Sequence, residues 1–228
     1  MWMRVVVSIG GSVLIEEMNP DRIKSYASVL REAAVSNEIF VVVGGGETAR
    51  RYINVGRALG ANEAICDRIG IDITRLNAYL LILALGDAAY PEVVRNYQDA
   101  PLAGGSGIVV MGGVSPGYTT DAVSAILAEY IGADLLINAT SVDGVYSSDP
   151  KLDPASRRYE RITAKELVEI VIGTRLDAGS TSVIDPVGAK VIERSGIRTI
   201  VLDGRNPLNI LKAIKGEKIG TEIVSESV

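Results

Sequence analysis

Short, continuous apolar runs alternate along the chain with longer stretches in which apolar residues recur every three or four positions. Runs that are apolar at every position are typical of strands buried on both faces of a parallel sheet. The three-to-four spacing is that of one face of a helix. The pattern predicts strands over residues 4–9, 39–43, 108–111, 135–138 and 199–202. It predicts helices over residues 48–59, 71–85 and 120–131. Further helices are expected to begin at Asn19-Pro20, at a capping box formed by Thr163 and Glu166, and at Asn206-Pro207. Another helix is expected to end at Gly196.

The alternation of strands and helices decides the fold class. It predicts an α/β protein with three α/β/α layers and a mostly parallel central sheet. The chain shows no internal repeat, low-complexity segment or linker, so residues 1–228 are expected to form a single domain. The stretch over residues 142–161 is longer than a usual connection. We therefore expect it either to be functional or to divide two lobes of the domain.

The composition removes several classes of enzyme. The chain has no histidine, which excludes Ser-His-Asp and Cys-His catalysis and zinc sites built on imidazole. Its net charge of −5 argues against a broad surface for nucleic acid polymers. Backbone amides, arginine, lysine, carboxylates and hard metal ions remain. Phosphoryl transfer is the leading reaction for such groups.

The sequence also bears on where the protein works. One cysteine, Cys66, cannot form an internal disulfide and is expected to be a small buried residue. The longest apolar runs, such as residues 78–85, are far shorter than the ~18 residues that span a membrane. The N-terminus lacks the pattern of a signal peptide. We therefore expect a cytoplasmic protein that does not associate with a membrane.

Three of the predicted strands end in glycine clusters, at residues 10–11, 44–46 and 112–113. Glycine lets backbone N–H groups approach an anion closely, and a following helix adds a favourable partial charge. A tight turn also needs glycine, so each cluster alone has a plain structural explanation. Three at one sheet edge favour several bound phosphates. No Gly-Lys-Ser/Thr phosphate loop and no Gly-x-Gly-x-x-Gly fingerprint occurs, which disfavours a common NTPase and a dinucleotide-binding oxidoreductase.

Two further segments carry polar groups suited to a nucleotide. Residues 114–121 supply hydroxyls and the Asp121 carboxylate where a helix begins, although Thr120 or Asp121 as a plain helix N-cap explains them too. Residues 138–150 follow the fourth strand. They fit a β-hairpin turning at Asp143-Gly144, or a base-and-ribose pocket in which Tyr146 contacts a purine and Asp149 accepts hydrogen bonds from hydroxyls.

An ordered set of motifs resembles the amino acid kinase family, and within it the uridylate kinases of the archaeal type. The resemblance runs essentially from end to end. Its motifs are Ser8-Ile9-Gly10-Gly11-Ser12, Val43-Gly44-Gly45-Gly46-Glu47-Thr48-Ala49-Arg50, Cys66-Asp67-Arg68-Ile69-Gly70, Thr74-Arg75-Leu76-Asn77-Ala78, Met111-Gly112-Gly113 through Asp121, Val142-Asp143-Gly144-Val145-Tyr146 with Asp149-Pro150, and Gly216-Glu217-Lys218-Ile219-Gly220-Thr221.

The resemblance implies an enzyme, a UMP kinase that transfers the γ-phosphoryl group of ATP to UMP, giving UDP, with Mg²⁺ as the cofactor. It implies an amino acid kinase-like fold, with an acceptor-binding lobe over roughly residues 1–131 and an ATP-binding lobe over roughly 132–228. It also implies a homohexamer. Phosphoryl transfer depends on positioning and charge neutralisation, so a chain without histidine can perform it.

The same resemblance assigns roles residue by residue. The ATP side would be formed by Gly10, Gly11, Ser12, Gly46, Arg50, Thr140, Tyr146 and Asp149. The UMP side would be formed by Gly45, Asp67 at the ribose, and Val114, Ser115, Pro116, Gly117, Tyr118, Thr119 and Thr120 around the uracil and phosphate. Asp121 and Arg50 are the candidate catalytic residues, with Asp121 anchoring Mg²⁺ through water or holding hydrogen-bond donors in place. No protein residue is assigned as a direct metal ligand.

The chain departs from the family pattern at two positions. Many members carry lysines where this chain has Ser8 and Ser182, and one such contact to a developing charge is worth ~10²–10³-fold in rate. Candidate substitutes are Mg²⁺ and a set of basic residues, of which Arg50 is preferred: Arg4, Arg50 and Lys190. The departures leave two alternatives open, a family phosphotransferase with a different acceptor and a nucleotide-binding regulator that has lost transfer.

Overall fold

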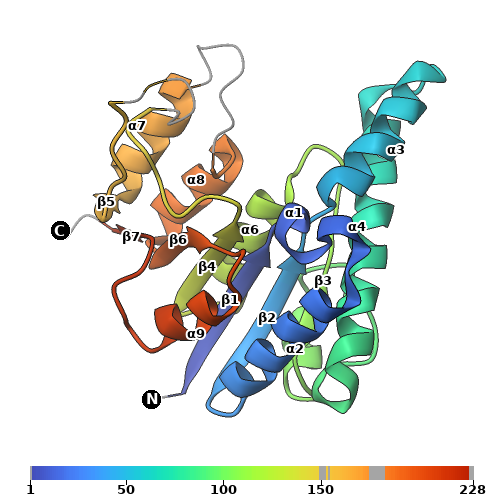
Figure 1. Cartoon of the computed structure of the whole chain (residues 1–228), viewed down its shortest axis with the longest axis horizontal. Coiled ribbons are helices and arrows are strands. Elements are labelled where there is room, and N and C mark those ends of the chain that lie inside the picture. The colour runs from blue at the N-terminus through green and yellow to red at the C-terminus, as the bar shows by residue number, and fades with distance from the viewer. Residues whose placement is uncertain (1, 149–152, 154, 175–182, 226–228) are drawn as a thin grey trace.

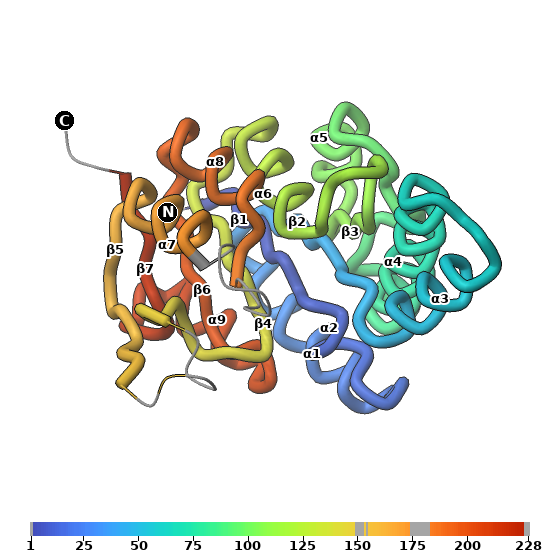
Figure 2. The backbone as a smooth tube through the Cα atoms, turned by 90° about the horizontal axis from the view of Figure 1, so that it is seen from above, coloured from blue at the N-terminus to red at the C-terminus, as the bar shows by residue number. Residues whose placement is uncertain are grey.

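The computed structural model describes residues 2–148, 153, 155–174 and 183–225. These residues form one seven-stranded sheet between two layers of helices, which Figure 2 shows from above. The predicted three-layer α/β/α fold with a mostly parallel sheet is therefore confirmed. Strands β1 and β2 lie in the middle of the molecule in Figure 1, with α3 and α4 at one end and β5 and α7 at the other.

The strand order is β3-β2-β1-β4-β6-β7-β5, and every neighbouring pair is parallel except β6 and β7. The strands are β1 (Met3–Ile9), β2 (Asn37–Val43), β3 (Val109–Met111), β4 (Leu135–Thr140), β5 (Arg161–Thr163), β6 (Thr199–Asp203) and β7 (Thr221–Val224). The central strand β1 pairs with β2 on one side and with β4 on the other. The first and second halves of the chain are thus joined through β1 and β4.

Helices cover both faces of the sheet. One layer is formed by α2, α4 and α9, with α1 at the end of β1 and α3 packed on α4; the other layer is formed by α5, α6, α7 and α8. The helices are α1 (Gly11–Leu14), α2 (Pro20–Ala34), α3 (Gly46–Ala58), α4 (Glu63–Leu85), α5 (Ala100–Gly104), α6 (Thr120–Ile131), α7 (Ala164–Thr174), α8 (Pro186–Ser195) and α9 (Leu208–Ile214), with short 3₁₀ turns η1 (Glu16–Met18) and η2 (Gly86–Ala88).

The continuous apolar runs have a direct structural reason. Successive residues of a strand point to opposite faces of the sheet. In β1, Val5, Val7 and Ile9 enter the core under α2 and α4, while Val6 enters the core under α6 and α8. Ser8 lies on the same face as Val6 and is buried, so this face ends in a polar residue.

Local end signals predicted several helix boundaries correctly. Asn19 accepts a hydrogen bond from the Asp21 backbone N–H and caps α2, with Pro20 at its first position. Thr163 and Glu166 form the reciprocal capping box that begins α7. Gly196 ends α8 in the left-handed conformation, at φ 65°.

The structure corrects three expectations. Strands β5 and β7 were not predicted, because a pairing of three or four residues leaves no sequence pattern of its own. The helix predicted over residues 71–85 begins earlier, at Glu63, where Asn62 caps it by accepting from the Ile65 backbone N–H. The short helix α5 was also missed.

The longer α4 bears on the expectation that no segment of the chain is long enough to span a membrane. The helical region Glu63–Ala88 is long and apolar enough to cross a membrane by length and composition, although the apolar runs in the sequence are short. Its buried side packs against α2, β2 and β3. Ala78, Leu81, Ile82 and Leu85 enter the hydrophobic core there. The packing accounts for the apolar character of this helix as that of a core helix.

Candidate functional site

Two glycine clusters meet backbone to backbone at the carboxyl ends of β1 and β2. A Cβ atom at Gly11 would lie 2.1 Å from the backbone nitrogen of Gly46 and 2.5 Å from the carbonyl oxygen of Gly44. Gly46 also has a φ of +64°, which favours glycine over any residue with a side chain. The two loops can approach this closely only because neither carries a side chain.

Hydrogen bonds fix the clusters to neighbouring strands. The Gly10 N–H donates to the Ala139 carbonyl in β4, and the Gly44 N–H donates to the Ile9 carbonyl in β1, both at 2.9 Å. The Asn77 side chain on α4 donates to the Gly44 carbonyl, also at 2.9 Å. The residues expected at the triphosphate are therefore close together, at the ends of the adjacent strands β1 and β2: Gly10, Gly11, Ser12 and Gly46.

Arg50 lies one turn inside α3, which begins at Gly46, the last residue of the second cluster. Its side chain is exposed and has no ion pair or hydrogen bond within the described part of the chain. The neighbouring Arg51, by contrast, pairs with Glu47 across one helical turn at 2.7 Å. Of this basic pair, Arg50 is the member free to contact a ligand.

The third glycine cluster packs against the middle of α4. The Gly113 N–H donates to the Thr74 hydroxyl at 2.6 Å, and the Arg75 guanidinium donates to the Gly113 carbonyl at 3.2 Å. A Cβ atom at Gly112 would lie 2.6 Å from the Thr74 hydroxyl oxygen. Helix α4 therefore fixes the start of the following loop, residues 114–119, which we call the acceptor loop.

A cleft of about 360 Å³ opens between the acceptor loop, α3 and α4. Six of the nine residues expected at the acceptor line it, together with Gly46: Gly45, Asp67, Gly117, Tyr118, Thr119 and Thr120. Val114, Ser115 and Pro116 are not among the lining residues. The cleft also has a lining that sequence reasoning missed: Ala49, Ile53, Gly70, Ile71 and Thr74. Their helical spacing from Gly45 and Asp67 was the available signal.

Asp67 holds the acceptor loop as well as lining the cleft. Its Oδ2 accepts a hydrogen bond of 2.8 Å from the Gly117 backbone N–H, fifty positions along the chain. Gly117 has a φ of +85°, so a side chain at this turn would be strained. The carboxylate of Asp67 therefore sets the shape of the loop around the cleft.

Asp121 faces two buried polar residues near the carboxyl ends of β1 and β4. Ser8 in β1 and Asn138 in β4 are register neighbours, both are buried, and both hydrogen-bond to the Asp121 carboxyl group. Burial, reinforced by the nearby Asp185 carboxylate, raises the pKa of Asp121 to about 7. The carboxyl group thus changes charge near neutral pH.

The start of α6 differs from one expectation. The N-cap of this helix is Thr119, whose hydroxyl accepts from the Ala122 N–H at 3.2 Å, and not Thr120 or Asp121. The cap position is the last residue before the helical backbone, which here is one place earlier than expected. Asp121 is therefore free to point toward Ser8 and Asn138.

The expected adenosine side is described in part. Thr140 ends β4, and Tyr146 donates a hydrogen bond of 2.8 Å from its hydroxyl to Asp143. A hairpin at Asp143-Gly144 does not form; an isolated bridge joins Tyr146 to Arg158. Asp149 lies outside the described residues, as does Ser182.

Two of the three basic residues proposed to replace the family lysines are engaged elsewhere. The Arg4 guanidinium lies near the start of β1, where it pairs with Glu38 at 2.7 Å and bonds the Ile131 carbonyl. Lys190 pairs with Glu193 along α8, also at 2.7 Å. Arg50 is the candidate that remains at the glycine clusters.

The described residues contain no group of three or more Asp, Glu or Cys side chains that could hold a metal ion. Mg²⁺ commonly binds through substrate phosphates and waters with few protein ligands. The donor set therefore fits a metal that arrives with a nucleotide, and does not form a cage built from the protein alone.

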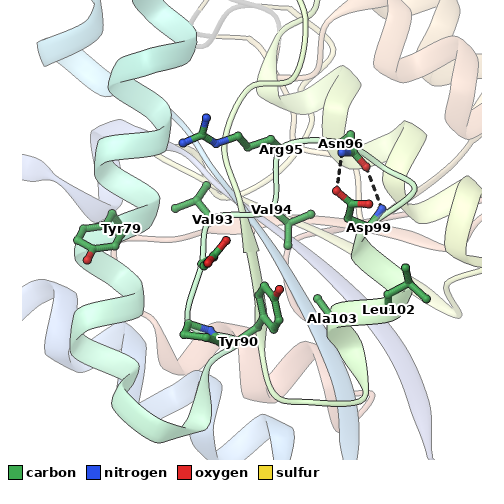
Figure 3. Close-up of a pocket in the computed structure, with 11 residues that line it drawn as sticks. Tyr79, Tyr90, Val93, Val94, Arg95, Asn96, Asp99, Leu102 and Ala103 are labelled. Carbon is green, nitrogen blue, oxygen red and sulfur yellow. Dashed lines mark hydrogen bonds between the residues drawn. The ribbon is translucent and has the colours of Figure 1, made fainter.

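A larger cavity, of about 660 Å³, lies away from these loops between α4 and the segment that leads to α5 (Figure 3). Tyr79, Tyr90 and Leu102 are among its lining residues, and Asn96 and Asp99 bond each other at its rim. None of the residues expected at either substrate lines it. Size alone therefore does not identify the site, whereas the smaller cleft contains the expected residues.

Comparison with known proteins gives consistent matches over nearly the whole chain. The model of the family described as "Amino acid kinase family" matches residues 3–203. Uridylate kinase of Methanoculleus marisnigri is 56% identical, over 98% of this chain and 96% of that protein. Uridylate kinase of Methanococcoides burtonii is 54% identical with the same coverage. The crystal structure of uridylate kinase from Archaeoglobus fulgidus superposes with a TM-score of 0.89 at 49% identity, covering 97% of this chain and 100% of that one.

Proposed function

The chain belongs to the amino acid kinase family, and on that premise we propose that it is a UMP kinase, which transfers the γ-phosphoryl group of ATP to UMP. The products are ADP and UDP. The observation that carries the proposal is the identity of more than half of the residues to uridylate kinases over 98% of the chain. The cleft supports it, because its loop and Asp67 lie beside the glycine clusters.

The reaction requires little acid–base catalysis from the protein. The phosphate of UMP is ionised at neutral pH and is itself the nucleophile, so no side chain needs to remove a proton from it. Catalysis then depends on holding two phosphate groups in line and on stabilising charge that develops between them. This is consistent with a chain that lacks histidine.

The chain supplies positive potential from its backbone and from one arginine. Helices α3 and α6 begin at Gly46 and Thr120, and the N-terminus of a helix carries a partial positive charge. The glycine clusters leave room for phosphate oxygens next to backbone N–H groups. Arg50 adds a full charge in the first turns of α3. Asp121 positions the buried donors of Ser8 and Asn138 at the same edge.

We assign the two substrates to different halves of the chain. Residues 1–131 would form most of the UMP site, and residues 132–228 would hold the adenosine through Thr140, Tyr146 and Asp149. The triphosphate would extend over Gly10, Gly11 and Ser12. Mg²⁺ bound with ATP would neutralise phosphate charge, the role that lysines have in many family members.

We also propose a homohexamer in the cytoplasm. Exposed apolar side chains lie along α3, at its C-cap residue Leu59 and along the adjacent helix α4: Tyr52, Val55, Leu59, Ile65, Leu76, Tyr79 and Leu83. An apolar patch of this kind is typical of a surface that another subunit covers. Helices α3 and α4 lie side by side at one end of the molecule (Figure 1).

The test is a phosphoryl-transfer assay with ATP, Mg²⁺ and one acceptor at a time, following ADP release. The acceptors are UMP, CMP, dUMP and acetylglutamate. We expect turnover of UMP to exceed that of acetylglutamate by at least about a thousandfold, or 4 kcal/mol in transition-state stabilisation. Turnover of another acceptor in preference to UMP would overturn the assignment of the acceptor loop. Binding of ATP and UMP without turnover would identify a nucleotide-binding regulator instead.

A further inference from the structure

A side-chain hydrogen bond joins the acceptor loop to the second half of the chain. The Thr119 hydroxyl donates to Oδ2 of Asp185 over 2.5 Å, between residues 66 positions apart. Two other side chains bond the backbone of the loop, Asp67 at Gly117 and Arg75 at Val114, and both belong to α4. Within the described residues, the Thr119–Asp185 bond is the sole hydrogen bond between this loop and residues beyond 132.

Both partners are also helix caps. Thr119 caps α6, and Asp185 caps α8 by accepting from the backbone N–H groups of Val187 and Gly188 through its other oxygen, Oδ1. The two oxygens of the Asp185 carboxylate therefore accept from different partners: Oδ1 from the first turn of α8 and Oδ2 from Thr119 in the loop. The helix cap and the bond to Thr119 can therefore be tested by separate substitutions at Asp185.

The two helix starts are held close together where the caps meet. A Cβ atom at Gly188 would lie 3.4 Å from the Ala122 backbone nitrogen, so the first turn of α8 lies against that of α6. The Val183 carbonyl accepts a hydrogen bond from Asn138, which ties the segment before Asp185 to β4. Asp185 is thus held by β4 and α8 and presents a fixed acceptor to Thr119.

We propose that Asp185 is a positioning residue for UMP, which it serves by holding Thr119 and thereby the acceptor loop in the shape that binds the nucleotide. The inference rests on the proposed function. An acceptor loop without this bond would have to be ordered by UMP itself, and the ordering would weaken UMP binding. ATP, placed on the other side of the glycine clusters, would lose little.

The test uses two variants at Asp185 and measures dissociation constants for UMP and ATP by calorimetry. Asp185→Ser keeps a hydroxyl that caps α8 but is too short to reach Thr119. Asp185→Asn keeps the capping oxygen and places a second polar atom facing Thr119. We expect Asp185→Ser to bind UMP about tenfold more weakly and ATP within about twofold of wild type, since hydrogen bonds to charged groups are worth about 1.5–3 kcal/mol. Asp185→Asn should recover part of the UMP affinity.

The matched control is Asn19→Ser. Asn19 caps α2 and precedes Pro20 at the first helical position, as Asp185 precedes Pro186, but it contacts no part of the site. We expect this control to leave both dissociation constants within about twofold of wild type. An equal loss of UMP and ATP affinity in Asp185→Ser would show a general structural role and would overturn the proposal.

A double-mutant cycle with Thr119→Val tests the pair itself. If Asp185 acts through Thr119, Asp185→Ser should weaken UMP binding much less in the Thr119→Val protein than in wild type. Equal effects in the two backgrounds would overturn the proposal. Should Asp185→Ser fail to fold, the same cycle with Asp185→Asn provides the result. Failure of wild type to bind UMP would overturn the proposed function, whereas unchanged UMP binding by Asp185→Ser would overturn this inference alone.

Discussion

At the scale of single residues, the most informative feature is a change from apolar to polar on one face of the sheet. On the face beneath α6, β1 changes from Val6 to Ser8 and β4 changes from Leu136 to Asn138, and Ser8 and Asn138 are buried side by side. Buried polar groups need partners, and here the partner of both is the Asp121 carboxyl group. The arrangement concentrates hydrogen-bonding groups at the strand ends where the phosphates are proposed to lie.

The raised pKa of Asp121 predicts a specific dependence of stability on pH in the ligand-free protein. Because the folded pKa of about 7 exceeds the ordinary value of 3.8, the folded state binds more protons between these values. The penalty for ionising Asp121 is therefore absent below about pH 4, grows as the pH rises, and is complete above about pH 7. It amounts to roughly 4 kcal/mol.

The variant Asp121→Asn should remove this penalty. We expect its free energy of unfolding to exceed that of wild type at pH 8 by more than it does at pH 5, as measured by urea denaturation at both pH values. The control is Asp87→Asn, which alters an exposed carboxylate in η2. Its free energy of unfolding should depend on pH as that of wild type does. If the free energy of unfolding changed with pH by the same amount in wild type and in Asp121→Asn, the assignment of this titration to Asp121 would be wrong.

At the scale of elements, helix α4 determines the shape of the acceptor cleft. Thr74, Arg75 and Asp67 project from one side of the helix and bond the backbone of residues 113–117. A loop whose backbone groups are satisfied by a rigid helix is already close to its binding shape, so little entropy remains to be lost when a ligand enters. The helix thus supplies both a wall of the cleft and the restraint on the loop opposite.

This double role of α4 predicts that Asp67→Asn affects the two nucleotides unequally. Asparagine keeps an oxygen that accepts from the Gly117 N–H, so the loop retains its bond, but the negative charge that we propose to face the ribose is lost. Since charged acceptors are worth about 1 kcal/mol more than neutral ones, we expect UMP to bind about five- to tenfold more weakly. Calorimetry with ATP should show little change.

A control on the same helix separates charge from position. Asp72→Asn removes an exposed carboxylate of α4 that is not among the residues lining the cleft. Its UMP affinity should remain at the wild-type level. Were Asp67→Asn to weaken ATP and UMP to the same extent, the proposed division of the site between the two nucleotides would be wrong.

At the scale of the whole molecule, exposed large apolar side chains within the described residues are most numerous along α3 and α4. The layer of α6, α7 and α8 is packed on the sheet, whereas α3 lies on α4 at one end of the molecule (Figure 1). Apolar side chains along α3 and α4 are exposed. Leu59 is 82% exposed and Leu83 is 62% exposed. Leucine side chains this exposed, one at the C-cap of α3 and one on α4, favour an association between copies of the chain.

We therefore expect the double variant Leu59→Asp, Leu83→Asp to have a smaller assembly mass than wild type. Each buried leucine side chain contributes about 1.5–3 kcal/mol to an interface, and a buried carboxylate adds a further cost. Light scattering after size-exclusion chromatography measures the mass. Leu208→Asp, an exposed leucine on α9, is the control and should assemble as wild type does. An unchanged mass in the double variant would place the interface elsewhere.

Local features of the fold could be predicted from the sequence, while pairings between distant segments could not. Asn19, Gly196 and the Thr163–Glu166 box act within a few residues, so the helix ends they specify are visible in the sequence itself. Strands β5 and β7 are stabilised by pairing across about sixty residues, and nothing in their own composition indicates it.

The same distinction holds for the site. The glycine clusters and the residues of the acceptor loop could be identified as candidates from motifs. The bonds that shape the cleft could not, because they join Asp67 to Gly117 and Thr119 to Asp185 across fifty or more positions. The contact between the backbones of Gly11 and Gly46 likewise depends on strands β1 and β2 lying side by side. The roles of the candidate residues with either nucleotide remain predictions.

The place of β1 in the sheet has a consequence for how the chain is made. Val5 pairs with Leu135, so one edge of β1 has no partner until 130 further residues have been synthesised. At translation rates of roughly 5–20 residues per second, this wait lasts on the order of ten seconds. During that time an apolar strand edge is open to pairing with other nascent chains. We expect newly made protein truncated before β4 to aggregate, and factors that shield emerging chains to increase the yield of folded protein.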